Sequence, residues 1–133
     1  IKKKENAVYC LVGDGECHEG TIWESCNVAA NLELGNLTLI VDWNGSAQQL
    51  MPKDKLVAKF EAFGFETFLL DGHKRGEFEK TFKKINHNNF IPKAIVAKTV
   101  KGKGVSFTEG HGRWHHKVPN DSEMEEIYME LSS

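Results

Sequence analysis

The hydrophobic residues of this chain form short continuous runs that alternate with stretches of helical spacing. The runs, which are typical of strands, cover residues 7–12, 37–43, 66–70 and 94–97. The helical stretches cover residues 19–34, 53–63, 78–85 and 121–131. The run 7–12 is apolar throughout and ends at a glycine, which predicts a strand buried on both faces. We expect Asp121 or Ser122 to cap the last helix.

The regular alternation of strands and helices defines the expected fold class. Connections of this kind are right-handed crossovers, so they predict an α/β fold in which a doubly wound parallel sheet carries helices on both faces. A length of 133 residues suits a single domain spanning 1–133. A long loop that is rich in glycine and lysine, residues 101–119, separates the last strand from the last helix.

Composition and charge exclude several classes of protein. Hydrophobic residues make up 40% and charged residues 27%, a balance typical of a globular chain rather than a disordered one. A net charge of -2 gives no reason to expect a nucleic-acid partner, and no apolar run is long enough to predict a membrane partner. An odd set of three cysteines without a CxxC pair indicates a reducing, cytoplasmic setting. We expect Cys10 and Cys26 to be small buried residues.

Two oxygen-bearing side chains follow the first two strands. Asp14 stands after the first strand, and Asn44 follows it by 30 positions, after the second. The intervening helix runs back across the sheet for roughly 23 Å, and the second strand returns by roughly the same length. Ligands of open parallel sheets bind beyond the carboxyl ends of the strands. Asp14 and Asn44 are therefore predicted to meet at that edge.

The residue types at this edge suit a magnesium ion and a phosphate group. A carboxylate and an amide oxygen are hard ligands of the kind that Mg²⁺ prefers. Gly13 and Gly15 allow close approach of the backbone, and the helix that follows would direct its N-terminus toward an anion. Gly-Asp-Gly alone is also ordinary turn chemistry. The spacing between Asp14 and Asn44 favours the metal site.

Several motifs in the expected order resemble the transketolases. Residues 13–16 together with 41–44 resemble the thiamine-diphosphate motif, which begins with GDG and ends with an Asn after a buried strand. Residues 19–24, 101–107 and 114–119 resemble transketolase segments more narrowly. The likeness spans nearly the whole chain and is greatest to the diphosphate-binding subunit of split transketolases. It implies that residues 1–133 are a partial diphosphate-binding domain, which lacks the first part of that domain. It implies that thiamine diphosphate and Mg²⁺ are the cofactors.

The resemblance also implies roles for individual residues. Asp14, Asn44 and the backbone carbonyl of Ser46 match the magnesium ligands. The positions that match the cofactor-binding set are Gly13, Asp14, Gly15, Glu16, Asn44, Lys101 and His115. His115 matches a histidine placed to help proton transfer, and a neutral imidazole suits that task. Glu19 matches a glutamate at the dimer interface that communicates with the partner's active site.

The implied reaction is transfer of a two-carbon ketol unit from a ketose to an aldose, with sugar phosphates as the expected substrates. The pyrimidine-binding half and its ring-activating glutamate have no counterpart in this sequence. We therefore expect the chain alone to be inactive. Its expected partner is that half, in the same or another chain, within a homodimer or heterotetramer. The loop after Asn44 departs from the usual pattern, which allows a substrate preference different from that of the usual family members.

Other interpretations stay open. The chain could belong to another thiamine-diphosphate enzyme, such as deoxyxylulose-phosphate synthase or a 2-oxoacid dehydrogenase component, or to a non-catalytic partner subunit of the same fold. A zinc cluster of Glu109, His111, His115 and His116 is disfavoured by the glycines at positions 110 and 112. A dinucleotide-binding module is the weakest alternative, because the three-glycine spacing is missing.

Overall fold

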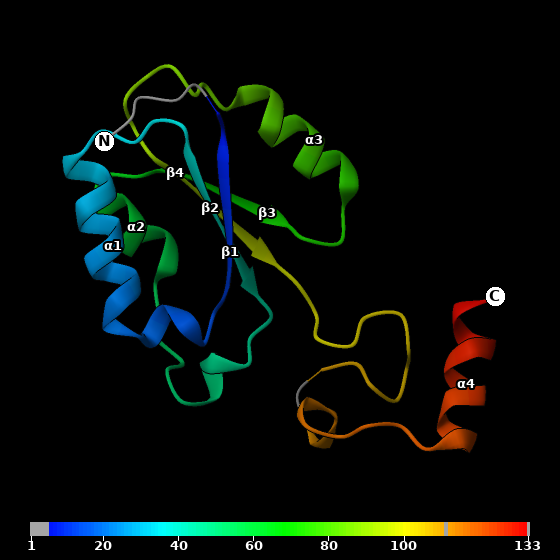
Figure 1. Ribbon diagram of the computed structural model, residues 1–133. Coiled ribbons are helices and arrows are strands. Elements are labelled where there is room, and N and C mark those ends of the chain that lie inside the picture. Colours follow the sequence, from blue (N-terminus) through cyan, green and yellow to red (C-terminus); the bar gives the residue numbers. More distant parts are fainter. Residues whose placement is uncertain (1–5, 111, 133) are drawn as a thin grey trace.

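A parallel β-sheet organises the computed structural model, which describes residues 6–110 and 112–132 (Figure 1). Within those residues the strands are β1 (Val8–Gly13), β2 (Leu37–Trp43), β3 (Glu66–Asp71) and β4 (Lys93–Lys98). They lie in the order β1-β2-β4-β3, and every neighbouring pair is parallel. The α/β class and the parallel sheet predicted from the sequence are confirmed.

Helices cover both faces of the sheet, as a doubly wound fold requires. Figure 1 shows α1 and α2 on one face and α3 on the other. Their bounds are α1 (Gly20–Asn31), α2 (Leu56–Ala62) and α3 (Arg75–Lys84). The described part of the chain also forms three short 3-10 turns that the sequence pattern does not predict: η1 (Glu16–His18), η2 (Ala47–Gln49) and η3 (Arg113–His115). The first of these separates the Gly-Asp-Gly turn from α1, so α1 does not begin directly after that turn.

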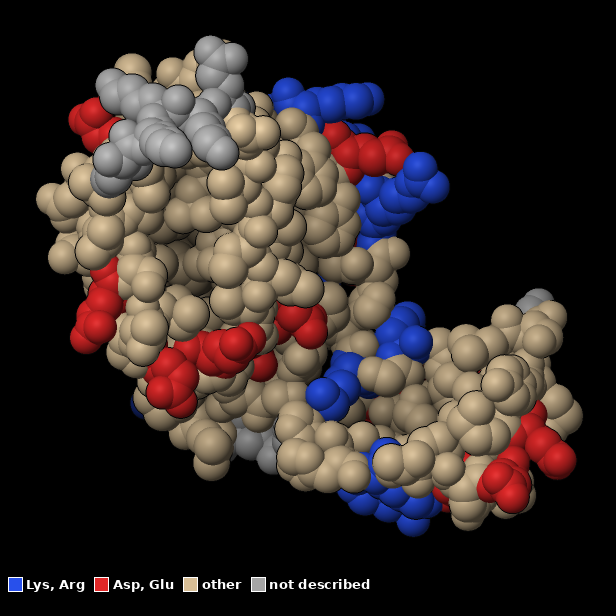
Figure 2. All heavy atoms as spheres, viewed as in Figure 1, with Lys and Arg blue, Asp and Glu red and all other residues tan. Residues whose placement is uncertain are grey.

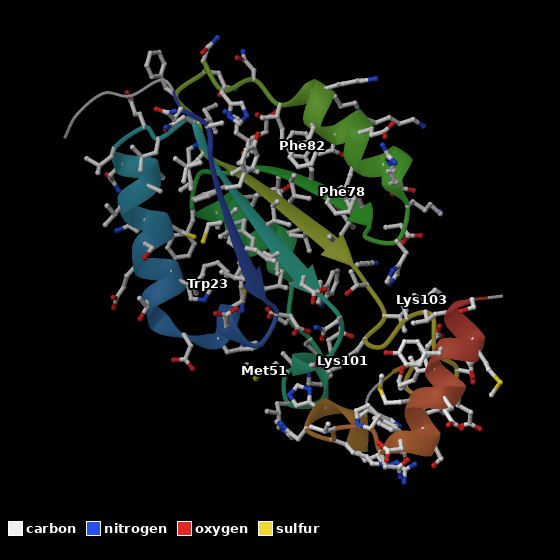
Figure 3. The ribbon with its side chains drawn as sticks, turned by 45° about the vertical axis from the view of Figure 1, so that its right-hand side comes forward. Trp23, Met51, Phe78, Phe82, Lys101 and Lys103 are labelled. Atoms are coloured by element: carbon white, nitrogen blue, oxygen red, sulfur yellow. The ribbon has the colours of Figure 1, made fainter. Side chains whose placement is uncertain are left out.

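Alternating residues of the central strands build a core on each side of the sheet. Leu39 and Val41 of β2 pack with the fully buried Phe60 of α2, whereas Ile40 belongs to the core under α3. Trp23 of α1 joins the first core, where its ring centroid lies 5.0 Å from that of Phe60. Burying side chains of this size contributes roughly 1.5–3 kcal/mol each. Figure 3 shows Trp23 on one side of the sheet, with Phe78 and Phe82 of α3 on the other.

The first strand differs from expectation, because it is not buried on both faces. Leu11 is 71% exposed and Tyr9 52%. β1 is an edge strand of the sheet. α3 packs against β3 and meets β1 through Phe82, whose ring centroid lies 5.8 Å from that of Tyr9. Cys10 on this strand is exposed, which corrects the expectation that it is buried. Cys26 is buried as predicted, and burial raises the pKa of its thiol to about 11.

The C-terminal segment extends away from the sheet and ends in α4 (Asp121–Leu131) (Figure 1). The cap of this helix is Asn120, not Asp121 or Ser122. The Asn120 side chain accepts the Glu123 N–H, and the Glu123 carboxylate accepts the Asn120 N–H. This reciprocal pair is a capping box, which satisfies two N–H groups at the helix start. None of the helices within residues 6–110 and 112–132 has the length and apolar character of a membrane span.

Candidate functional site

The carboxyl ends of β1 and β2 bring Asp14 and Asn44 to one edge of the sheet. The register pairs Gly13 with Asp42, so Asp14 and Asn44 follow their strands within one residue of the same level. The Asp14 N–H donates to the Asp42 carbonyl at 3.0 Å, which extends the strand pairing by one residue. The geometric expectation drawn from the strand–helix–strand spacing therefore holds.

Asp14 is a buried carboxylate with little local compensation. Its side chain belongs to a residue only 3% exposed, and Oδ2 accepts a single N–H, that of Ala47, at 3.2 Å. Within the described part of the chain, no Lys, Arg or His forms an ion pair with it. A buried anion is costly unless a cation or several donors compensate it. The site therefore suits a bound cation.

Asn44 presents its amide in a fixed orientation. Oδ1 accepts the Ser46 N–H at 3.0 Å, and Nδ2 donates to Oδ2 of Asp42 at 3.1 Å. Ser46 and Ala47 are consecutive, so the N–H groups held by Asn44 and Asp14 come from adjacent residues. A charged carboxylate oxygen and a neutral amide oxygen thus converge on one short stretch of backbone.

The surroundings of these two side chains fit Mg²⁺ and a diphosphate. The Ser46 hydroxyl oxygen is buried, and it finds no hydrogen-bond partner among the described residues. At Gly15 a Cβ would meet no atom within 4 Å, so the backbone there is open to a ligand. Glu16 turns back instead, and its Oε2 accepts the Gly13 N–H at 2.7 Å. Carboxylate, amide and carbonyl oxygens are the donors that suit this ion.

A pocket of about 700 Å³ opens beside these residues. Side chains or backbone from three separate segments line it, among them Gly15, His18, Ser46, Ala47, Met51 and His115. His115 lies in η3, with its ring at a right angle to that of His116 and the centroids 4.3 Å apart. His18 approaches the Asp54 carboxylate at 3.6 Å. The structure therefore brings His115 to the same pocket as the segments that carry Asp14 and Asn44.

Lys101 and Glu19 lie outside the residues that line this pocket. Lys101 begins the C-terminal loop, where its carbonyl accepts the Gly110 N–H at 2.8 Å. Figure 3 places Lys101 and Lys103 between the sheet edge and α4, and Figure 2 shows basic side chains gathered in that hollow. Glu19 is exposed and directly precedes α1.

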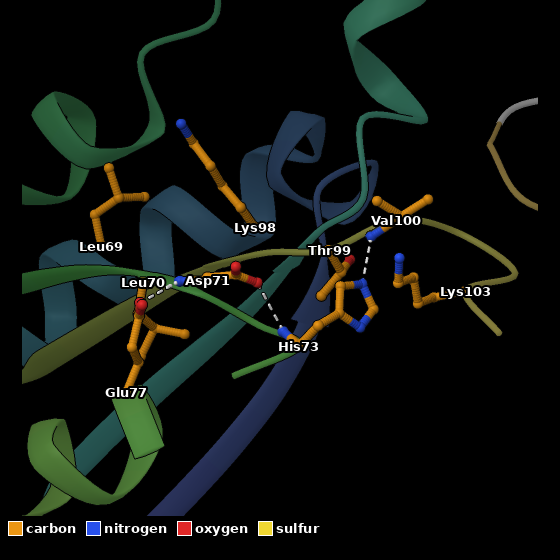
Figure 4. A pocket seen from close by; sticks show the side chains of 9 residues that line it. All are labelled: Leu69, Leu70, Asp71, His73, Glu77, Lys98, Thr99, Val100 and Lys103. Carbon is orange, nitrogen blue, oxygen red and sulfur yellow. Dashed lines mark hydrogen bonds between the residues drawn. The ribbon is translucent and has the colours of Figure 1, made fainter. Parts of the chain in front are cut away.

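A second pocket, of about 520 Å³, lies at the ends of β3 and β4 (Figure 4). There, Nε2 of His73 accepts the Val100 N–H at 2.7 Å, and Oδ1 of Asp71 accepts the His73 N–H at 3.0 Å. Hydrogen bonds from the His73 backbone and the Lys74 side chain lower the pKa of Asp71. The arrangement holds the chain that leads from β4 to Lys101.

Two other chemistries receive no support from the described residues. The described residues contain no group of three His, Cys, Asp or Glu side chains placed to hold a metal ion. His111, a member of the zinc cluster considered above, lies outside the described residues. Burial, with the charge of Asp54 next in importance, raises the pKa of Cys17 to about 12. That thiol is therefore protonated near neutral pH and unsuited to nucleophilic attack.

Fold and site together define an α/β domain with pockets at the carboxyl edge of a parallel sheet, the place where open sheets of this kind bind ligands. A family model described as "Transketolase, thiamine diphosphate binding domain" matches residues 2–132. The chain belongs to this family.

Known relatives agree with this assignment. The chain is 40% identical over 93% of its length to one subunit of the apulose-4-phosphate transketolase of Actinobacillus succinogenes, covering 46% of that protein. It is 34% identical over 99% of its length to the protein of the same name from Phocaeicola vulgatus, covering 49%. It is also 37% identical to human transketolase, of which it covers 21%. The chain thus spans about half of these subunits and a fifth of the human enzyme.

Solved structures agree on the fold. A transketolase from Campylobacter jejuni superposes with a TM-score of 0.85 at 29% sequence identity, over 96% of this chain and 21% of that one. The resemblance drawn from the motifs is thereby confirmed at the level of family and fold.

Proposed function

We propose that this chain is the diphosphate-binding part of a thiamine-diphosphate- and magnesium-dependent transketolase, which transfers a two-carbon ketol unit from a ketose to an aldose. The observation that carries the proposal is the convergence of Asp14 and Asn44 on the adjacent N–H groups of Ala47 and Ser46. The otherwise uncompensated buried carboxylate of Asp14 supports a cation at this point.

The chain's own residues would bind and orient. Asp14, Asn44 and the Ser46 carbonyl would hold Mg²⁺, and the backbone of Gly13, Gly15 and Glu16 would face the diphosphate. When bound, thiamine diphosphate supplies the carbanion chemistry. His115, which lines the pocket, would hold or accept a proton from the donor sugar, a task that suits an imidazole near neutral pH.

Two further residues take roles at the margins of the site. Lys101 places a positive charge on the same C-terminal segment as His115, where it would attract an anionic group of cofactor or substrate. Glu19, exposed before α1, would meet the partner at a dimer interface and communicate with the partner's active site.

Sugar phosphates are the proposed substrates, because the two bacterial relatives are named for apulose 4-phosphate. Both of these relatives are also named as one subunit of their enzyme, which supports a second chain, for which we propose the pyrimidine-binding half. On this proposal the complete enzyme is a cytoplasmic homodimer or heterotetramer. The chain by itself is inactive, since the ring-activating glutamate belongs to the partner half.

An Asn44→Ala variant tests the proposal in the chain assembled with its pyrimidine-binding half. Loss of the amide oxygen should weaken Mg²⁺ and thiamine diphosphate binding together by more than about tenfold, since Asn44 would hold the ion that accompanies the diphosphate. Isothermal titration calorimetry measures both affinities. Asn36→Ala is the matched control, because that residue precedes β2 at the opposite edge and bonds to the Asn6 carbonyl. Unchanged affinity for both ligands in Asn44→Ala would remove the metal role.

A further inference from the structure

Asp42 links the segments that form the proposed metal site. It lies near the end of β2, and both oxygens of its carboxylate accept hydrogen bonds. Oδ2 accepts from Nδ2 of Asn44 at 3.1 Å, and Oδ1 accepts from the Thr99 hydroxyl. Its backbone carbonyl accepts the Asp14 N–H at 3.0 Å. Asp42 therefore connects Asp14 after β1, Asn44 after β2 and Thr99 after β4.

The bond to Asn44 decides which end of the amide faces the ligand. An asparagine amide has an accepting oxygen and a donating nitrogen, and only the oxygen can bind a cation. Asp42 accepts from the nitrogen, while the Ser46 N–H donates to the oxygen. A rotated amide would set its nitrogen against the Ser46 N–H and its oxygen against the Asp42 carboxylate. Both contacts would then be repulsive.

The bond to Thr99 holds the beginning of the C-terminal segment against the same strand. Thr99 also donates its N–H to the Trp43 carbonyl at 3.1 Å, and Val100 is held by His73. The carboxylate of Asp42 is thus fixed from two sides, by an amide and by a hydroxyl. A carboxylate fixed in this way can determine the orientation of its neighbour.

We propose that Asp42 is a positioning residue that orients the Asn44 amide so that Oδ1, and not Nδ2, faces the magnesium ion. This inference rests on the proposed function. Asp42 would not hold the metal itself. It acts through Asn44, as outer residues around metal ligands commonly do.

A double-mutant cycle at positions 42 and 44 tests the proposal by Mg²⁺ titration calorimetry at saturating thiamine diphosphate, in the chain assembled with its partner half. Asp42→Ala should weaken Mg²⁺ binding about 10- to 100-fold. In that background Asn44→Asp should recover most of the loss, because the two oxygens of a carboxylate are equivalent and no wrong orientation exists. The gain in Mg²⁺ affinity from Asn44→Asp should be several-fold larger in the Asp42→Ala background than in the wild-type background. With Asp42 present, the carboxylates at positions 42 and 44 repel each other.

A purely structural role for Asp42 predicts a different pattern, because a change at position 44 would not restore the metal affinity. Glu66→Ala is the control: Glu66 begins strand β3, at the end far from the site, and its carboxylate accepts from the Asn89 side chain. The Mg²⁺ affinity of this variant should stay within about twofold of wild type. Thermal unfolding of the metal-free variants reports any loss of fold separately.

If Asp42→Ala does not fold, Asp42→Asn replaces it. Asp42→Asn should lose less Mg²⁺ affinity than Asp42→Ala. Asn44→Asp should again restore affinity, since the amide introduced at position 42 can donate to the new carboxylate at position 44. Wild-type affinity in Asp42→Ala, or a loss that Asn44→Asp leaves unchanged, would overturn the inference. Absence of magnesium-dependent cofactor binding in the unmutated protein would instead refute the proposed function.

Discussion

Replacing Gly102 by alanine should open the loop that carries Lys101. Gly102 has φ +72°, and a Cβ at this position would overlap the Thr108 carbonyl oxygen and lie 2.7 Å from the carbonyl carbon. Both atoms belong to the backbone, so no side-chain rotation relieves the contact. The loop must therefore move apart at this point.

The size of the effect follows from the contacts that would be lost. A left-handed conformation costs an alanine about 1 kcal/mol. Opening the loop also breaks the bond from the Thr108 hydroxyl to the Gly102 carbonyl, 2.9 Å, and that from the Gly110 N–H to the Lys101 carbonyl, 2.8 Å. Each bond contributes about 1 kcal/mol. The sum of about 3 kcal/mol corresponds to roughly a hundredfold change in the opening equilibrium.

Hydrogen exchange of the Gly110 amide measures that equilibrium directly. In Gly102→Ala the exchange protection factor of the Gly110 amide should fall by about two orders of magnitude. If the protection factor in wild type is smaller than that, all protection should be lost. Gly104→Ala is a close control, because Gly104 also has a positive φ, +105°, but its Cβ would meet only the Leu131 side chain at 3.4 Å. That variant should lose about tenfold at most, from backbone strain alone. Equal losses in the two variants would refute the role of the close approach.

Two further predictions concern buried and paired charges. Lys93→Met should lower the free energy of unfolding by about 2–4 kcal/mol in urea, because Nζ donates to the carbonyls of Gly35 and Asn86 and to the Asn89 side chain; unchanged stability would contradict this. Hydrogen bonds from Ser106 lower the pKa of Glu130, so this contact stabilises the fold above the ordinary glutamate pKa of about 4.3 and is lost as the pH falls through the lowered value. The Ser106 amide shift, followed by NMR against pH, should report that loss, and a shift that stays constant below about pH 4 would contradict it.

Local signals in the sequence were sufficient for most of the elements. The predicted strand 37–43 coincides with β2, and the last predicted helix coincides with α4. Alternation of strands with helices, together with glycine stops, depends only on residues close in sequence. The last helix shows the limit: its cap is Asn120 rather than Asp121 or Ser122, because Asn120 pairs with Glu123 in a reciprocal capping box.

The meeting of Asp14 and Asn44 was also predictable, since one crossover of known rise connects them. His73 lies near a strand end, but the sequence pattern does not show what it holds, and nothing in that pattern marks Thr99. Their roles arise from bonds to Val100 and to Asp42, which lie 27 and 57 positions away. No periodicity or spacing in a single sequence shows which side chains make these two contacts.

By itself the sequence determined the α/β class, the parallel crossover and the residue types at the sheet edge, because these follow from side-chain periodicity and chain geometry. Only the tertiary structure decided that β1 lies at the edge of the sheet and is exposed, that Lys101 lies outside the residues lining the pocket beside Ser46, and that Asp42 bonds to both Asn44 and Thr99. Strand order and loop placement depend on packing between distant segments, and hydrogen-bond partners become defined only when that packing is complete.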